Sequence, residues 1–463
     1  MRRWLPTSAV VAMTEDWRQL LGTSEACECG RTHTVPTREV VIGAAALEGL
    51  SDVLARHCPG RRGAMIADEV TWEVAGRRAV HAAHGWDLSP IVLRPQVPGH
   101  SLKADEAAVA QVQAALPGEL DFLVCVGSGT LNDLTKVAAT ERGVPSVCVA
   151  TAPSMNGYPS AIAALSRGGI KRTEACEPPV AIVCDTEVLS AAPERMVQAG
   201  LGDLLSKSTS SADWLVAHLL RGEFYCERPV RLLSGAEELC VGEAGAIGRR
   251  EPAAVERLIT GLIVSGIGMA LSGASSPASG GEHLLSHYWD MTAEARRREP
   301  DLHGRQVAVA TLMAGRLYEG LRDRAAPVSA DRQPAPGRAE SLAHFAPLVG
   351  PEAAEEIATL LLRKQLGPEA TQEALRPLRE SPEGFWRRVR ALQRPRAEIE
   401  RAYLAAGVPT TPAEIGVSPE EARAALLFAR HIRDRYTVLD LAADLGLLEE
   451  LAAEIAPVSD RGH

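Results

Sequence analysis

The chain has 463 residues, of which 46% are hydrophobic and 23% are charged, and its formal net charge is −10. This length and composition suit a soluble globular protein of two or three domains. The negative charge argues against a general binder of nucleic acid or of anionic membranes. The first 17 residues lack the continuous apolar run of a signal peptide, and nine cysteines without such a signal indicate a reducing compartment. We therefore expect a cytoplasmic protein without a membrane span.

Residues 1–190 alternate short β-branched runs with helix-like stretches such as residues 104–116. The segments that are typical of strands are 39–43, 62–68, 90–95, 121–129, 145–151 and 179–185. Nearly continuous apolar strands that alternate with helices favour a parallel sheet covered on both faces. The sequence therefore predicts an α/β domain over residues 1–190.

Residues 191–463 carry helical periodicity rich in Ala, Leu, Glu and Arg, and strand signals almost vanish. We predict an all-α domain over this range. Its most apolar stretch, residues 258–274, is broken by Gly and Ser and is short for a membrane span, so a buried core helix is the better interpretation. The Pro/Ala-rich residues 324–340 indicate a surface loop or insertion. Residues 431–455 are helical again and are expected to pack back onto the bundle.

A glycine-rich turn follows the predicted strand 121–129. Gly127 and Gly129 would let the backbone approach a ligand, and the helix that begins after them would present unpaired N–H groups to a pyrophosphate. The turn matches neither the G-x-G-x-x-G fingerprint nor a Walker loop. A plain strand-to-helix turn, with Asp133 near the first turn of the helix, is the alternative interpretation.

The next predicted strand ends in a second polar loop, which contains Thr151, Ser154 and Asn156. The carboxyl ends of parallel strands share one edge of a sheet, and ligands of doubly wound sheets bind at that edge. Two neighbouring polar loops at this edge together favour a nucleotide site.

An aspartate and two histidines, Asp203, His283 and His303, fit a divalent cation. His283 and His287 are one helical turn apart, His303 follows in a loop-like segment, and Asp203 comes after two glycines near a predicted helix start. Asp203, His283 and His303 would form a three-ligand set with a position left for water or substrate. Taken alone, Asp203 could equally be a helix cap. The pattern is not the His-Glu-x-x-His of metalloproteases, because Glu282 precedes the first histidine.

The segment ACECGRTH offers Cys27, Cys29 and His33 as a second group of possible metal ligands. The sequence shows no evident fourth ligand for a small zinc site. A structural use of these residues without metal is therefore the favoured interpretation.

Five ordered segments carry a family resemblance: GSGTLNDLTK, TAPSMNGYPSA, AGLGDLLSK, SGGEHLLSHYW and LHGRQVAVATL. Together they resemble the sn-glycerol-1-phosphate dehydrogenase family, which shares a superfamily with glycerol dehydrogenase and, more distantly, dehydroquinate synthase. The resemblance covers residues 25–320, with a weaker echo at 432–441. It implies a Rossmann-like NAD(P)-binding domain followed by an all-α metal- and substrate-binding domain.

The resemblance also implies roles for single residues. Asp203, His283 and His303 would bind one divalent ion, zinc or nickel, and His287 would contact the substrate or orient the site. Lys207 stands where related iron-type enzymes have a further histidine ligand, so a three-ligand site is expected. The residues that match NAD(P)-holding positions are Gly127, Ser128, Gly129, Thr130, Leu131, Thr151, Ser154 and Ser160.

The implied reaction is hydride transfer between NAD(P)H and dihydroxyacetone phosphate, a small phosphorylated three-carbon substrate, to give sn-glycerol 1-phosphate. The chain departs from the family at Asn156, where relatives carry an acidic residue that contacts the substrate. Either lower activity or a different substrate would follow, such as another phosphorylated or polyhydroxylated carbonyl. A lyase like dehydroquinate synthase and a nucleotide-binding protein without catalysis are the remaining alternatives.

Three positions keep open assignments. Lys171 and Arg172 are candidates for holding the substrate phosphate, although a solvated hairpin is the favoured role. Asp68, at the end of strand 62–68, could approach the adenosine ribose or cap the strand end. A homodimer is a further expectation, with the helical region beyond residue 320 as its possible interface.

Overall fold

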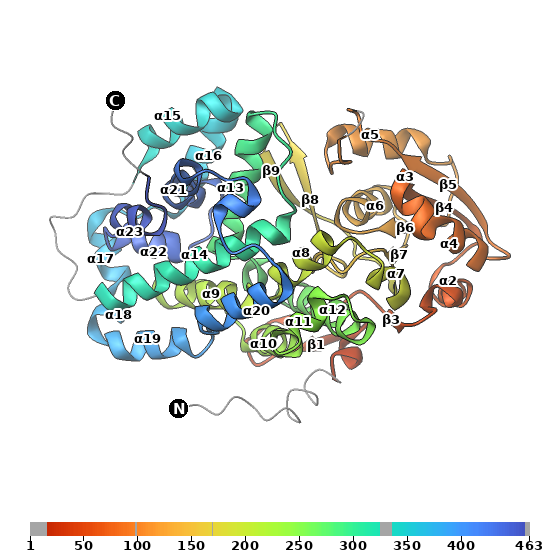
Figure 1. The fold of residues 1–463 in the computed structure, drawn as a ribbon, viewed down its shortest axis with the longest axis horizontal. Coiled ribbons are helices and arrows are strands. Elements are labelled where there is room, and N and C mark those ends of the chain that lie inside the picture. The colour runs from red at the N-terminus through yellow and green to blue at the C-terminus, as the bar shows by residue number, and fades with distance from the viewer. Residues whose placement is uncertain (1–15, 98–99, 169, 325–335, 459–463) are drawn as a thin grey trace. The chain divides into compact units, whose positions relative to one another are not determined.

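The computed structural model describes residues 16–97, 100–168, 170–324 and 336–458 (Figure 1). The chain divides into two compact units. The first unit comprises residues 1–167, 171–204 and 231–274, and the second comprises residues 168–170, 205–230 and 275–463. The sequence places the change from α/β to all-α near residue 190, and that domain boundary stays a prediction.

The first unit is built on a six-stranded parallel sheet with the strand order β3-β10-β7-β6-β4-β5. Its strands are β3 (Glu39–Gly43), β4 (Arg62–Asp68), β5 (Asp87–Leu93), β6 (Phe122–Gly127), β7 (Ser146–Ala150) and β10 (Ala181–Asp185). These are the six strands that the sequence predicts, so the parallel sheet is confirmed. β5 begins three residues earlier than predicted, at Asp87.

Helices cover both faces of this sheet. Phe122, Val124 and Val126 of β6 pack with α2 (Leu50–His57), η3 (Trp72–Gly76) and α4 (Arg77–Ala82) in one apolar cluster. Two more helices, α5 (Glu106–Ala115) and α6 (Gly129–Arg142), pack together on strands β4 to β7. The connections from β5 to β6 and from β6 to β7 run along the sheet in the opposite direction to those from β3 to β4 and from β4 to β5. Because such crossovers are right-handed, α5 and α6 lie on the opposite face. The predicted helix at 104–116 corresponds to α5.

Two small hairpins accompany the sheet. One pairs β1 (Ser24–Ala26) with β2 (Thr32–Thr34), and the other pairs β8 (Ile162–Arg167) with β9 (Ile170–Ala175). The second confirms the hairpin predicted around Lys171 and Arg172. At Asp68 the local structure shows a cap, and an approach of its carboxylate to the adenosine ribose stays a prediction. Its carboxylate accepts the Thr71 N–H at 2.7 Å and caps the short helix α3 (Glu69–Thr71).

The other helices of the first unit are η1 (Asp16–Leu20), η2 (Ala46–Gly49), α7 (Thr186–Ser190), α8 (Glu194–Leu204), α11 (Ala244–Gly248) and α12 (Pro252–Ser272). The helix α10 (Glu227–Val241) begins in the second unit and ends in the first. α12 contains most of the apolar stretch predicted at 258–274. It is the one helix in the described ranges with the length and composition of a membrane span, and 78% of its most apolar window is buried in the protein. The buried core helix is therefore confirmed.

Apart from residues 168–170, which belong to the β8–β9 hairpin, the described elements of the second unit are all helices, as predicted. Its core surrounds α9 (Lys207–Arg221), α13 (Gly281–Ala295) and α14 (His303–Arg324). The surrounding elements are η4 (Ser276–Ala278), α15 (Arg338–Val349), α16 (Pro351–Lys364), α17 (Pro368–Ala374), α18 (Arg376–Glu380), α19 (Pro382–Arg390), α20 (Arg396–Ala406), η5 (Pro412–Ile415), α21 (Pro419–Phe428), η6 (Ala429–Ile432), α22 (Val438–Asp444) and α23 (Leu448–Ile455).

Two predictions concern the far end of this unit. The predicted loop at 324–340 falls mostly on residues 325–335, which lie outside the described residues, and α15 begins at Arg338. The final helical stretch at 431–455 forms the end of η6 together with α22 and α23. Both of these helices contact α14, so this stretch packs onto the bundle as predicted.

Candidate active site

The glycine-rich turn connects β6 directly to α6. A Cβ atom on Gly127 would lie 2.4 Å from Leu131 Cδ1, so the chain itself requires glycine at this position. A Cβ atom on Gly129 would make only an ordinary contact, 3.6 Å from Met155 Cγ. Ser128 is the N-cap residue of α6, but its side chain makes no capping hydrogen bond. The first turn of α6 is therefore not capped by a side chain, which suits a helix start that receives an anion.

The two polar loops lie next to each other at the carboxyl edge of the sheet. β6 and β7 are paired, with Gly127 opposite Ala150. The Thr151 N–H then donates to the Gly127 carbonyl at 3.1 Å and joins the loops beyond the strand ends. Ser154 is half-buried in the second loop, where its N–H donates to the Ala152 carbonyl at 3.0 Å. The geometry thus confirms the expected adjacency of the two loops.

A buried lysine that the sequence reasoning missed holds the end of the second loop. The Lys136 ammonium lies 3.3 Å from both the Ser160 hydroxyl and the Gly157 carbonyl, and it pairs with Asp133 at 2.8 Å. The Ser160 hydroxyl is also 2.8 Å from the Gly157 carbonyl. Ser160 is therefore fixed from within the protein, and its contact with a cofactor stays a prediction. A lysine within the apolar run of α6 was the available signal.

Asn156 and Asp203 are brought together from the loop after β7 and from α8. The Asn156 backbone N–H donates to Asp203 Oδ2 at 2.8 Å, and both residues are buried. The Asn156 side-chain amide points to α12 instead, where it donates to the Ser265 hydroxyl at 3.0 Å. Asp203 lies near the end of α8 and not at its N-cap. One of its oxygens is held by a loop amide, while the carboxylate belongs to the penultimate residue of α8.

Glycines in two helices let this loop approach closely. A Cβ atom on Gly200 of α8 would lie 1.8 Å from the Pro153 carbonyl oxygen. A Cβ atom on Gly266 of α12 would lie 2.3 Å from the Asn156 carbonyl oxygen. Both obstacles are backbone atoms, which cannot rotate away as a side chain can. The position of the loop, and with it the bond between Asn156 and Asp203, therefore depends on these two glycines.

The three histidines lie together in the second unit. His283 and His287 are on α13, and His303 is the first residue of α14. The ring centroid of His303 is 5.2 Å from that of His283 and 5.3 Å from that of His287, and the rings of His287 and His303 are stacked. The centroids of His283 and His287 are 6.4 Å apart. The structure thus brings the predicted histidine set together.

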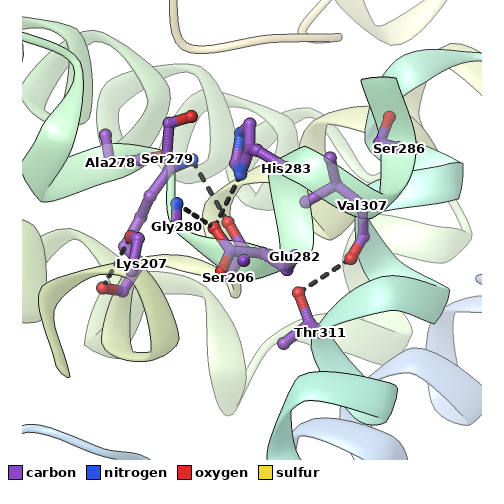
Figure 2. A network of polar contacts seen from close by, with 12 residues as sticks. Ser206, Lys207, Ala278, Ser279, Gly280, Glu282, His283, Ser286, Val307 and Thr311 are labelled. Carbon is purple, nitrogen blue, oxygen red and sulfur yellow. Dashed lines mark hydrogen bonds and ion pairs between the residues drawn. The ribbon is translucent and has the colours of Figure 1, made fainter. Parts of the chain in front are cut away.

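Glu282 fixes the tautomer of His283 (Figure 2). The His283 Nδ1 atom lies 2.7 Å from Glu282 Oε1, which also accepts the Gly280 N–H at 2.8 Å. Burial by itself raises the pKa of Glu282, but the bonds from His283 and Gly280 outweigh it and the pKa falls below its ordinary value. Because an ionised carboxylate can only accept, His283 Nδ1 carries the proton and Nε2 keeps its lone pair.

Ser286 and Gln306 do the same for His303. The Ser286 hydroxyl donates to Gln306 Oε1 at 2.7 Å, so its oxygen accepts from His303 Nδ1, which is 3.0 Å away. The proton of His303 therefore also lies on Nδ1, and Nε2 is the nitrogen with ligand character. The sequence reasoning missed Glu282, Ser286 and Gln306 as partners of the histidines.

Asp290 is a further acid beside the histidines. One ligand atom each from His287, Asp290 and His303 lies within 4.8 Å of the other two. Asp290 follows His287 by three residues, so both lie on one face of α13. This spacing of three residues can be read from the sequence.

Two buried charges shape the start of α13. The Asp213 carboxylate accepts the Gly281 N–H at 2.6 Å and the Tyr318 hydroxyl, and burial together with the charge of Glu282 raises its pKa to about 7. Lys207, at the position where iron-type enzymes have a histidine, donates to the Ala278 carbonyl at 2.9 Å (Figure 2). Lys207 therefore holds the loop before α13.

Comparisons with a family model and with solved structures identify the class of fold. The model of the iron-containing alcohol dehydrogenase family matches residues 41–193. A probable glycerol dehydrogenase from Sinorhizobium meliloti has a similar fold, with a TM-score of 0.59 and 19% identity over 90% of this chain and 98% of that one. Sulfoacetaldehyde reductase from Bifidobacterium kashiwanohense, solved with NAD+, gives a TM-score of 0.57 and 14% identity over 92% and 99%. The chain thus has the iron-type alcohol dehydrogenase architecture.

Sequence relatives narrow the class. Glycerol-1-phosphate dehydrogenase (NAD(P)+) of Bacillus licheniformis is 32% identical over 432 residues, 93% of this chain and 94% of the relative. The enzyme of the same name from Haloarcula marismortui is 30% identical over 91% of this chain and 96% of the relative. The chain belongs to the glycerol-1-phosphate dehydrogenase family. This confirms the resemblance that the five ordered segments carry.

Proposed function

We propose that this protein interconverts dihydroxyacetone phosphate and sn-glycerol 1-phosphate by hydride transfer with NAD(P)H. The observation that carries the proposal is the hydrogen bonding of His283 and His303, which is alike in the two residues. Each places its Nδ1–H on a partner in the protein, Glu282 or Ser286, and keeps Nε2 for a ligand. Such partners are typical of histidines that bind a metal. The substrate and the cofactor are those for which the related glycerol-1-phosphate dehydrogenases (NAD(P)+) are named.

The residues fit one divalent ion, zinc or nickel, with Asp203, His283 and His303 as ligands. The two imidazole nitrogens and a carboxylate oxygen are donors that both metals accept. The Asn156 N–H orients Asp203 through Oδ2, which supports a ligand role for this carboxylate. When bound, such an ion would withdraw electron density from the substrate carbonyl. The set of His287, Asp290 and His303 is the alternative that the second unit offers.

The first unit would hold the dinucleotide, which supplies or accepts the hydride. The first turn of α6, from Ser128 to Leu131, would bind the pyrophosphate through backbone N–H groups and the helix dipole. Thr151, Ser154 and Ser160 would contact the rest of the cofactor from the second loop. His287 would hydrogen-bond a substrate hydroxyl or move its proton, since an imidazole titrates near neutral pH.

The test is an assay of NADH and NADPH oxidation with dihydroxyacetone phosphate, after chelation and refilling with zinc or nickel. We expect turnover with at least one cofactor and one metal, and loss of turnover in the chelated protein. Absence of turnover in all four combinations would overturn the proposal. Light scattering of the same sample checks the expected homodimer.

Asn156 supports a second candidate, the reduction of another small phosphorylated or polyhydroxylated carbonyl. Its side-chain amide donates to the Ser265 hydroxyl at 3.0 Å, so the protein provides a partner for asparagine at this position. Its bond to Asp203 comes from the backbone and does not depend on the side chain. The substitution therefore changes what the substrate meets and leaves the support of Asp203 intact.

We expect Asn156→Asp to raise kcat/KM for dihydroxyacetone phosphate by about one to two decades. A charge-assisted hydrogen bond contributes about 1.5–3 kcal/mol, which converts to that range. Steady-state kinetics of the wild type and the variant measure the effect, and Asn156→Ala shows what the amide itself contributes. If Asn156→Asp gains nothing while another carbonyl is turned over, the second candidate replaces the first.

We expect Glu282→Gln to weaken metal binding by about 10–100-fold, because the neutral amide polarises His283 less than a carboxylate does. Competition with a chromogenic chelator measures the affinity. Glu294→Gln, at an exposed position near the end of the same helix, is the matched control and should bind metal as the wild type does. Equal affinities in the two variants would remove Glu282 from the proposed site.

A further inference from the structure

The β1–β2 hairpin carries two cysteines in a tight turn. The Cys27 N–H donates to the Arg31 carbonyl at 3.0 Å, and the Gly30 N–H donates to the Cys27 carbonyl at 3.0 Å. Gly30 has a φ of +84°, a left-handed conformation that favours glycine. The turn thus folds Cys27 and Cys29 back over the start of β2, and both thiols are half-buried.

His33, in β2, faces these thiols. Its Nδ1 hydrogen-bonds the Leu271 carbonyl of α12, and because a carbonyl can only accept, Nδ1 carries the proton. The other nitrogen, Nε2, then has the lone pair and lies 3.3 Å from the Cys29 sulfur. The three ligand atoms of Cys27, Cys29 and His33 lie within 4.8 Å of one another. A histidine held by a backbone carbonyl through one nitrogen is typical of zinc ligation through the other.

Cys27, Cys29 and His33 all lie in the first unit, and so does Leu271 of α12, whose carbonyl holds the His33 ring. Their positions relative to one another are therefore set within one compact unit.

We propose that Cys27, Cys29 and His33 bind a zinc ion. Two thiolates and one imidazole supply three of the four ligands of a tetrahedral zinc site and leave one position for a further ligand. Through His33, the ion would join the turn between β1 and β2 to the end of α12. The site is separate from the residues proposed for catalysis and does not depend on the proposed function.

The first test uses cobalt in the full-length protein, after removal of zinc under reducing conditions. A cobalt–thiolate charge-transfer band in the near ultraviolet is expected, because this site contains thiolates. The band reports on this site alone, since the catalytic ligands proposed above contain no sulfur. The Asp203→Ala variant, which lacks a catalytic ligand, should keep this band. Absence of the band in the cobalt-loaded wild type would overturn the site, whatever the enzyme assay shows.

The second test counts zinc in the Asp203→Ala background. One equivalent per chain is expected there, and adding Cys29→Ser should remove it. Cys58→Ser is the matched control, since that half-buried thiol lies outside the group and burial raises its pKa to about 12. Retention of the zinc in the Cys29→Ser variant would refute the assignment.

A third measurement needs no variant and is therefore independent of folding defects. Reaction of the wild type with a thiol reagent should be slow at Cys27 and Cys29 while zinc is bound and fast after chelation, as peptide mass spectrometry of the labelled protein shows. Equal labelling of both cysteines with and without chelator would count against the site.

Discussion

Replacing His303 with alanine is expected to remove one equivalent of metal per chain and to lower turnover roughly a thousandfold or more. The imidazole is one of three proposed ligands, and a bound ion contributes several kcal/mol to the stabilisation of charge that develops on the substrate oxygen. The His303 ring also lies beside the rings of both His283 and His287. Metal analysis and steady-state kinetics of the purified variant measure both effects.

The control for this experiment is His84→Ala, because His84 is exposed and lies outside the histidine group. It should retain both metal and turnover. Asp203→Ala should behave like His303→Ala, with the same loss of one metal equivalent. Dinucleotide affinity should be nearly unchanged in His303→Ala, which separates a lost ligand from a misfolded protein. If His303→Ala keeps its full metal content and turns over within a few-fold of the wild type, the ligand set is refuted.

The sequence predicts the parallel sheet well because its strands are nearly continuous apolar runs. Cys125, Cys148 and Cys184 lie inside such runs, and all three are buried in the structure. Apolar strands of this kind need cover on both faces, which leads directly to helices on each side. β1 and β2 escaped prediction because they have three residues each and mostly exposed side chains, so they carry no apolar pattern.

The histidines that the structure groups stand out in the sequence, but their hydrogen-bond partners do not. His283 and His303 stand out by residue type and spacing. Ser286 and Gln306 matter only because one serine hydroxyl lies between an amide oxygen and His303, which depends on how α13 packs on α14. The same holds for the Leu271 carbonyl, which lies 238 residues from His33 in the chain and accepts its Nδ1–H.

Gly200→Ala is expected to destabilise the first unit by about 2 kcal/mol and to weaken binding of the dinucleotide. The new methyl group would meet the Pro153 carbonyl oxygen, a backbone atom, at 1.8 Å. Overpacking of this kind costs about 1–3 kcal/mol, and a collision with backbone belongs at the upper end. The gain of about 1 kcal/mol in helix propensity offsets part of the cost. Chemical denaturation and NADH fluorescence titration measure the two effects.

The loss of dinucleotide affinity is the more specific of the two effects, because it reports on the position of the loop and not on the stability of the fold. Relief of the collision must move Pro153 away from α8, and the same short loop carries Ser154 and the Asn156 N–H that holds Asp203. Gly118→Ala is the control, since a Cβ atom there has no neighbour within 4 Å. We expect Gly200→Ala to lose dinucleotide affinity and metal together, although it alters no proposed ligand. A variant that is destabilised but binds both normally would show that the loop adjusts without moving Asp203, and that the glycine serves packing alone.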